Sequence, residues 1–132
     1  MFAFITIGTK NLSKSSKFYD EILKPLNIFR IINEDRYVGY AKKANLQLIQ
    51  QGKSELIEFY LMLPFNKKKA TFGNGSMIVF KTKTSKIVDE FHQISLINGA
   101  TSEGSPGPRH NEHYYAYIRD LDGNKICAFA SS

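Results

Sequence analysis

The 132-residue sequence predicts an α+β fold built from two βαβββ modules. Three observations lead to this prediction. The expected order of one strand, one helix and three strands occurs twice along the chain. Matching residues in the two halves are separated by a constant 73 positions. The apolar fraction of 42% is that of a folded globular domain. We therefore expect a single domain over residues 1–132, with modules over about 1–66 and 74–132.

The first module begins with a strand and a helix. The run FAFITIG, residues 2–8, is apolar and β-branched, which predicts a strand buried on both faces. Asn11 is a good N-cap for the next helix, because its side-chain oxygen can accept a free backbone N–H. Pro25 ends this helix, since the residue before a proline is pushed out of the α region. The predicted buried face of the helix is Leu12, Ser15, Phe18, Tyr19, Ile22 and Leu23.

Three strands are expected after this helix, because their runs are apolar and rich in β-branched and aromatic residues. Residues 45–55 fit either a short strand or an excursion from the sheet, and both interpretations stay open. The expected strands are NIFRIIN (27–33), RYVGYAK (36–42), which follows a turn at Glu34-Asp35, and LIEFYLML (56–63), which ends at Pro64.

The second module repeats this order after a polar loop that contains Lys67–Lys69. Thr84 is the predicted helix N-cap, and Asn98-Gly99 closes the helix. The predicted apolar stripe of the helix is Ile87, Val88, Phe91, Ile94, Leu96 and Ile97, with His92 partly buried beside it. The expected strands are residues 76–82, 100–103, 113–119 and 124–130, with a Gly- and Pro-rich loop over 104–112 and a two-residue hairpin turn at Asp122-Gly123.

The constant offset indicates an internal duplication. A four-stranded sheet with a helix on one face leaves its other face uncovered. We therefore expect two curved mixed sheets to form a cleft, which is the concave geometry of small-molecule sites. The matched pairs are Phe4 and Met77, Ile5 and Ile78, Thr9 and Thr82, Phe18 and Phe91, and Leu23 and Leu96.

Charge and composition narrow the classes of partner. The net charge is +6, but the lysines are scattered, and no basic helix face or aromatic RNA-binding motif is visible. We therefore expect no nucleic-acid partner, and an anionic rather than a cationic ligand. No apolar run is long enough for a membrane span, and no signal peptide is evident. A single cysteine fits a reducing compartment, so we expect a cytoplasmic protein with no membrane partner.

Three stretches together resemble one known superfamily. They are FITIGTKNLSKSSKFYDEIL (4–23), PFNKKKATFGNGSMIVF (64–80) and YYAYIRDLDGNKI (114–126). In this order, on a duplicated βαβββ pattern, they resemble small bacterial glyoxalase-like members of the vicinal oxygen chelate superfamily, the glyoxalase, bleomycin-resistance and extradiol-dioxygenase group. The resemblance covers nearly the whole chain except residues 42–55. Leu121 stands where the superfamily usually has a proline.

The resemblance implies a divalent ion that polarises vicinal oxygens of a substrate, but this sequence departs from the expected ligands. Phe4 and Met77 occupy the usual first-strand ligand positions, and Cys127 stands where a glutamate is usual. Hard divalent ions prefer imidazole and carboxylate ligands. Glu58 is the one conventional ligand left, and one carboxylate does not hold a divalent ion. We therefore expect no metal and no cofactor, with an eroded metal site.

A second cluster with ligand chemistry is the segment from Arg109 to His113. His110, Glu112 and His113 could in principle ligate a metal, but they follow no metal-binding motif, so a polar loop is the preferred interpretation. A further interpretation makes Arg109, His110 and His113 a lid on an anionic ligand, because arginine offers a bidentate fork to carboxylates or phosphates.

Strand alternation predicts which aromatic side chains share a face. Tyr115, Tyr117 and Arg119 fall on one face of their strand, and Cys127 and Phe129 share a face of the next. Cys127 has no local feature that would lower its pKa, so we expect a small buried residue rather than a nucleophile. The predicted ligand-binding residues are Phe4, Glu58, Tyr60, Met77, Arg109, His110, His113, Tyr115, Tyr117, Cys127 and Phe129. Ordinary core packing is the competing explanation for the aromatic members.

Three functional hypotheses follow. The first is a superfamily member with an eroded metal site that binds a small anionic molecule in the inter-module cleft. The second is a metal-dependent lyase, isomerase or dioxygenase that recruits its ion through Glu58 and the His110–His113 segment. The third is a protein-interaction module without a ligand. The resemblance also implies a homodimer, because dimers are common in the superfamily.

Overall fold

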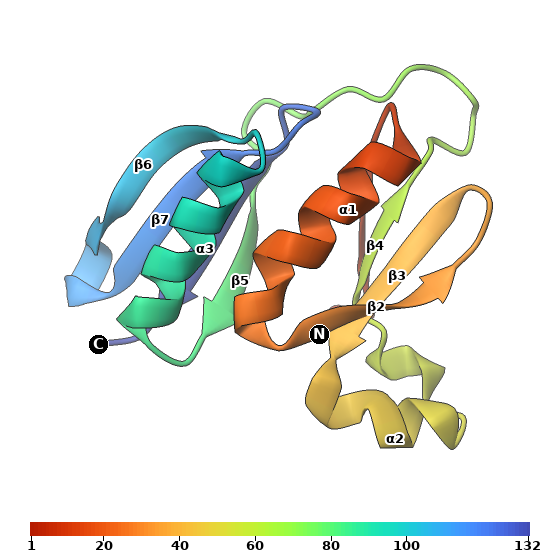
Figure 1. The fold of residues 1–132 in the computed structure, drawn as a ribbon, viewed down its shortest axis with the longest axis horizontal. Helices are drawn as coiled ribbons and strands as arrows, with labels where there is room; N and C mark the ends of the chain where they lie inside the picture. The colour runs from red at the N-terminus through yellow and green to blue at the C-terminus, as the bar shows by residue number, and fades with distance from the viewer. The chain divides into compact units, whose positions relative to one another are not determined.

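The computed structural model describes residues 1–132 and contains two units, Met1–Thr71 and Phe72–Ser132, here called the first and second modules. Each module holds one four-stranded mixed sheet with a long helix on one face (Figure 1). The strand orders are β1-β4-β3-β2 and β5-β8-β7-β6, so the two sheets have the same topology. The predicted α+β fold with two βαβββ modules is therefore confirmed.

The first module contains an edge strand, a long helix and three further strands of the same sheet. β1 pairs in parallel with β4, and the remaining neighbours are antiparallel. Its elements are β1 (Ile5–Gly8), α1 (Leu12–Leu23), β2 (Ile28–Asn33), β3 (Tyr37–Lys42), α2 (Leu46–Gln50) and β4 (Phe59–Met62). Single turns of 3₁₀ helix cover Lys24–Leu26, Lys43–Asn45 and Ser54–Leu56.

The second module repeats this plan. β5 pairs in parallel with β8, and β8, β7 and β6 follow in antiparallel order. Its elements are β5 (Ile78–Thr82), α3 (Ser85–Ile97), β6 (Thr101–Pro108), β7 (Tyr114–Arg119) and β8 (Lys125–Ala130), with a 3₁₀ turn at His110–Glu112. No helix in either module has the length and apolar character needed to cross a bilayer.

The helix starts show the duplication most directly. Asn11 and Thr84 are the N-caps of α1 and α3, as predicted, and their side chains accept backbone N–H groups of Lys14 and Ile87 at 3.0 and 3.3 Å. Two residues earlier, the hydroxyls of Thr9 and Thr82 donate to the cap residues' carbonyls at 3.3 and 3.1 Å. Each pair is separated by 73 positions, so the same capping device is used twice.

The core of the first module is aromatic. Tyr19 from α1 packs against Tyr40 and Phe59, with ring centroids 6.5 and 5.4 Å away. The Tyr40 hydroxyl lies 3.0 Å from the Asp20 carboxylate, which also pairs with Arg30. Burial of its ring, together with Asp20, raises the pKa of Tyr40. These contacts fasten α1 to β2 and β3.

Three predictions of burial or extent in the strands are wrong. β1 is not buried on both faces, because it is an edge strand with a helix on one side only, and Phe2 and Phe4 are 74% and 57% exposed. The segment 104–112 is not all loop, because β6 continues to Pro108 through two irregularities in its pairing with β7. Leu56 and Ile57 precede β4 rather than belonging to it.

Two further details differ from the prediction. The connection between β7 and β8 is five residues long rather than two, because the Asp120 carboxylate accepts the N–H groups of Asp122 and Asn124, both at 2.9 Å. Ile97 is 75% exposed, since it lies about half a turn around α3 from the buried Val88.

Of the two interpretations left open for residues 45–55, the structure shows the excursion. α2 lies beyond the end of β3 and outside the sheet (Figure 1).

Candidate functional site

The candidate site is the face of the second sheet that α3 leaves uncovered. β7 and β8 pair in a register that sets Tyr115 opposite Phe129 and Tyr117 opposite Cys127. The alternate residues Ala116, Ile118, Ile126 and Ala128 are fully buried on the helix side. The predicted face sharing is therefore confirmed, and it puts the aromatic side chains on the side away from α3.

The aromatic rings on this face form a continuous cluster with two cations beside it. The rings of Tyr115 and Tyr117 are parallel within 4°, with centroids 5.9 Å apart, and Phe129 lies 5.1 Å from Tyr115. Arg109 Cζ and Lys125 Nζ lie 5.1 and 5.3 Å from the centroid of Tyr117. Burial is the largest cause that raises the pKa of Tyr117, so its phenol stays protonated at neutral pH.

Arg109 is a fixed part of this face. Its guanidinium donates to the carbonyls of Ser105 at 2.7 Å, Tyr115 at 2.8 Å and Gly107 at 3.3 Å. A Cβ on Gly104 would lie 2.9 Å from the Tyr117 ring and 3.2 Å from Arg109 Nη2, so only glycine allows this close packing. These bonds tie its side chain to the sheet, and the lid role of Arg109 stays a prediction.

Arg119 and Lys125 extend the positive charge of the face, and neither was among the predicted site residues. Arg119 pairs with Glu103, donates to the Gly123 carbonyl at 3.0 Å and lies over the Phe72 ring. The register sets Arg119 opposite Lys125, on the same face as Tyr117. Strand alternation was the signal that could have identified Lys125, because it stands two residues before Cys127.

The two predicted histidines lie at the end of this face. His110 is the first residue of the 3₁₀ turn and His113 follows its end, and Asn111 and Glu112 between them have left-handed φ angles of 56° and 63°. The His110 ring lies 6.0 Å from Tyr115, and the His113 ring lies 5.2 Å from Phe129. The structure brings both histidines to the aromatic face. No group of three or more histidine, cysteine, aspartate or glutamate side chains is placed to hold a metal ion.

Cys127 lies on the same face but has no exposed surface. Its thiol donates to the Ala128 carbonyl at 3.3 Å, and burial raises its pKa to about 11. The thiol is therefore neutral at physiological pH, as expected of a small buried residue. Tyr117 and Phe129 beside it are partly exposed, and the role of Cys127 as a ligand contact stays a prediction.

The corresponding face of the first sheet is aromatic with little charge. Tyr60 packs edge-on against Phe4 and Tyr37, with centroids 5.3 and 6.0 Å away. Gly39 lies beneath, since a Cβ there would be 2.9 Å from the Tyr60 ring. Glu58 is exposed just before β4. The structure thus brings the predicted residues Phe4 and Tyr60 together, and it adds Tyr37, which was not among the predicted site residues.

Met77 is the remaining predicted site residue. It is 41% exposed and immediately precedes β5. By alternation it falls on the same side of β5 as Val79, which is opposite Cys127 in the register. Met77 thus stands at the start of the aromatic face of the second module.

Several solved structures are similar to this chain over nearly its whole length. A glyoxalase/bleomycin resistance protein from Albidiferax ferrireducens T118 is 34% identical, with a TM-score of 0.85, over 100% of this chain and 99% of that one. A glyoxalase/bleomycin resistance protein/dioxygenase family enzyme from Burkholderia phytofirmans PsJN is 15% identical, with a TM-score of 0.71 and 98% of each chain covered. Fosfomycin resistance protein FosX from Listeria monocytogenes is 18% identical, with a TM-score of 0.66, over 98% of this chain and 91% of that one.

The first of these similarities extends through both modules at substantial sequence identity, whereas the other two show the fold alone. No family model matches the sequence, and no curated protein matches it.

Proposed function

The chain belongs to the glyoxalase/bleomycin resistance family, and from this premise we propose that it binds a small anionic molecule on the aromatic face of its second sheet, without a divalent metal ion. The observation that carries the proposal is the Tyr117 ring with Arg109 and Lys125 both close to it. This arrangement offers a flat apolar surface together with positive charge. It suits a ligand with an apolar part and a carboxylate or phosphate-like group.

The rigidity of the cationic groups supports binding. Arg109 is held by three carbonyls and by contact with Tyr117, so little side-chain entropy remains to be lost when a ligand binds. Arg119 is similarly held by Glu103 and Gly123. A preorganised guanidinium binds an oxyanion more tightly than a free side chain, because its ordering cost is already met.

The residues at the implied metal positions do not fit a divalent ion. Phe4 offers an aromatic ring and Met77 a thioether, which is a poor ligand for hard ions. The Cys127 thiol is buried and protonated at neutral pH, and its hydrogen bond goes to the Ala128 carbonyl. Glu58 alone supplies a carboxylate. The donor set therefore supports a site that has lost its metal, and we derive no catalytic step through such an ion.

The finer features of the proposal rest on the sequence. We propose that Phe4 and Tyr60 contribute a second aromatic surface to ligand binding. A binding site in a cleft between the modules stays a prediction. We also propose a homodimer and a cytoplasmic location. Size-exclusion chromatography with light scattering tests the homodimer, and a single mass equal to one chain would contradict it.

A thermal-shift screen tests the binding proposal. The probes are small aromatic and aliphatic carboxylates and phosphonates, added one at a time. A true ligand raises the unfolding temperature in proportion to the logarithm of its concentration above its Kd, because at one hundred times its Kd it adds about 2.7 kcal/mol to the free energy of unfolding. The variant Lys125→Gln should weaken this effect. The matched control is Lys86→Gln, which removes the same charge from an exposed position on α3. Equal loss in both variants would contradict binding at the aromatic face.

Elemental analysis tests the metal-free part of the proposal. Protein purified without chelators should carry only substoichiometric transition metal. Near one equivalent of Zn, Ni, Mn or Fe per chain, lost in Glu58→Gln, would overturn it and favour the metal-dependent enzyme.

A further inference from the structure

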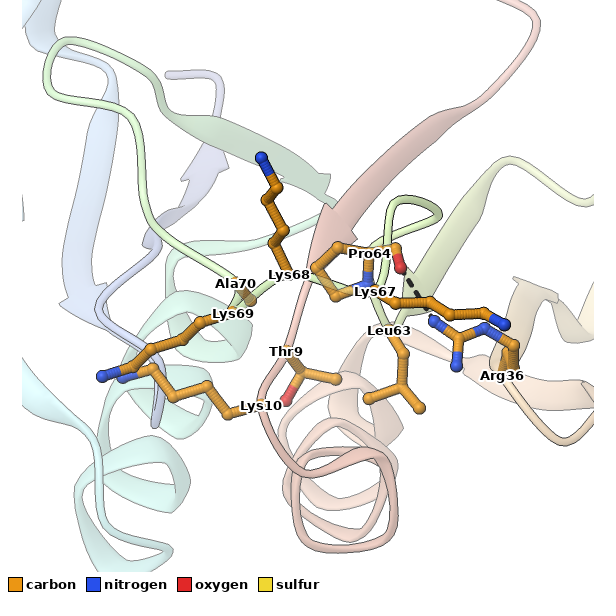
Figure 2. Close-up of a pocket in the computed structure, with 9 residues that line it drawn as sticks. All are labelled: Thr9, Lys10, Arg36, Leu63, Pro64, Lys67, Lys68, Lys69 and Ala70. Atoms are coloured by element: carbon orange, nitrogen blue, oxygen red, sulfur yellow. Dashed lines mark hydrogen bonds between the residues drawn. The ribbon is translucent and has the colours of Figure 1, made fainter.

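A pocket of about 320 Å³ opens in the first module where β1 and β4 end and β3 begins (Figure 2). Thr9 and Ala70 at this pocket are buried, and Leu63 and Pro64 are half-buried. Apolar groups from three segments thus line part of the cavity. The full lining is Thr9, Lys10, Arg36, Leu63, Pro64, Lys67, Lys68, Lys69 and Ala70.

Positive charge dominates the rim of this pocket. Five of the nine lining residues are lysine or arginine, and none is acidic. In Figure 2, Lys10 and Lys69 extend to one side, Lys67 extends to the other, Lys68 points in a third direction, and the Arg36 guanidinium points inward to the Pro64 carbonyl. Cations gathered around one cavity repel one another, so a bound anion would relieve this repulsion.

The chain around the pocket has a defined conformation. Arg36 Nη2 and the Lys67 N–H both donate to the Pro64 carbonyl, at 2.8 and 3.0 Å. The Lys68 N–H donates to the Asn66 side chain at 3.0 Å. Lys67 has a left-handed φ of 63°, which a lysine adopts only at a cost. These bonds hold the lysine segment in one turn rather than as a loose loop.

The other end of the segment is held by close packing. A Cβ on Gly8, the last residue of β1, would lie 3.2 Å from Ala70 Cβ, so the glycine lets the chain approach the strand end. Ala70 is accordingly only 5% exposed. Lys67–Lys69 are thus fixed between two anchored points, Pro64 and Ala70.

We propose that this pocket binds a small polyanion that carries two or more phosphate-like charges. Lysine ammonium groups suit phosphate as compact point charges, and cations on opposite sides of the cavity can contact separate anionic groups. The volume lies at the lower end of the range of small-molecule sites, and the apolar lining distinguishes the pocket from a flat basic surface. The pocket shares no residue with the aromatic face, so this inference stands or fails independently of the proposed function.

Isothermal titration with inorganic pyrophosphate at low salt tests the inference. We expect saturable binding at one site per chain, weaker binding of inorganic phosphate, and a loss of affinity at high salt, because exposed charges are screened. The variant Lys67→Asn/Lys69→Gln should weaken pyrophosphate binding about tenfold, since it removes two charge-assisted contacts. Asparagine is chosen at position 67 because it tolerates the left-handed conformation.

The matched control is Lys42→Gln/Lys43→Gln. It also removes two positive charges, but at the end of β3 that lies away from Arg36 and the pocket. It should change the affinity by less than about twofold, as expected for distant screened charges. Equal weakening of pyrophosphate binding in both double variants would mean that only the net charge of the protein matters, and it would overturn the proposed binding site in the pocket.

A second measurement keeps the inference testable if a variant fails to fold. In amide spectra of the unaltered protein, pyrophosphate should shift Thr9, Lys10 and residues 67–70, and shifts confined to other segments would overturn the inference. Vesicles containing phosphatidylserine provide the last arm, because the neighbouring Phe65 is 92% exposed and could enter a bilayer surface. Vesicle binding that pyrophosphate does not displace would replace the small polyanion with a membrane surface.

Discussion

The guanidinium carbon of Arg109 lies 5.1 Å from the centroid of the Tyr117 ring, while its N–H groups bind three main-chain carbonyls. Arg109 therefore joins β6, β7 and an aromatic ring in one contact. Lys125 lies near the same ring at 5.3 Å. The two cations thus differ in their bonding although they share a neighbour.

This difference gives the first prediction. Arg109→Gln should lower the free energy of unfolding by about 1–3 kcal/mol, because the carbonyls of Ser105, Gly107 and Tyr115 lose charge-assisted hydrogen bonds. Lys125→Gln loses a cation–π contact at a half-buried position and a charge near Glu103, but no hydrogen bonds to main-chain carbonyls, and should cost less than about 1 kcal/mol. Urea denaturation of both variants measures the difference. Equal costs would mean that the carbonyl bonds of Arg109 contribute nothing to stability.

The repeated helix caps give the second prediction. Asn11→Ala and Thr84→Ala should each destabilise the protein by about 1 kcal/mol, because each leaves an N-terminal N–H without its acceptor. Thr84→Asn should be close to neutral, since asparagine serves as the cap in the first module. Thermal unfolding measures all three, and Ser13→Ala on the exposed side of α1 is the control. A cost confined to one module would contradict equivalent capping.

Cys127 gives the third prediction, which concerns alkaline pH. Burial raises its pKa in the folded protein to about 11, so the folded state holds the thiol proton more tightly than the unfolded chain. The folded protein should therefore lose stability as the pH rises from about 9 to 11, by about 2–3 kcal/mol from this group. The measurement is the difference between the unaltered protein and Cys127→Ala in denaturant titrations across this range.

The same residue should react slowly. Ellman's reagent at pH 8 should modify native Cys127 far more slowly than the unfolded chain, because the thiol is neutral and has no exposed surface. Fast modification of the native protein would show that the aromatic face opens readily.

His92 gives the fourth prediction, which concerns acidic pH. It is buried on α3, and its Nε2 lies 2.9 Å from the Ser102 hydroxyl. Burial lowers its pKa, and Asp89 opposes this only in part. The neutral ring is thus favoured on folding, and stability should fall as the pH drops through and below about 6.5, the ordinary value for histidine. His92→Gln, which keeps a polar partner for Ser102, should show a shallower fall in urea titrations between pH 7.5 and 5.

Local rules predicted the fold well where one residue decides the structure. Asn11, Thr84 and Pro25 mark the helix ends in the sequence because their chemistry acts within a few residues of themselves. The duplication was also visible, since it is a comparison of the chain with itself. The extent of β6 was not, because the Gly- and Pro-rich run is held in the sheet by β7, and this pairing is a tertiary contact.

Only the part of the candidate site that follows from strand alternation was predictable from the sequence. Alternation identified Tyr115, Tyr117 and Phe129 as one surface, because the period of a strand fixes the side of each residue. It could not predict that Arg109 is tied to the sheet, since this depends on the irregular path of β6. The lysine pocket lay beyond sequence reasoning, because Lys10 and Arg36 join Lys67–Lys69 only after the strands pair.

The burial of Cys127 makes the molecule convenient for spectroscopic labelling. It is the only cysteine in the chain, and it has no exposed surface, so the unaltered protein is already an effectively thiol-free background. One cysteine introduced at Ser13 and another at Lys86, both exposed, would each accept a spin label or fluorophore without competition from position 127. Such a doubly labelled protein would report the separation between α1 and α3 in solution, and any change in it as a candidate ligand is added.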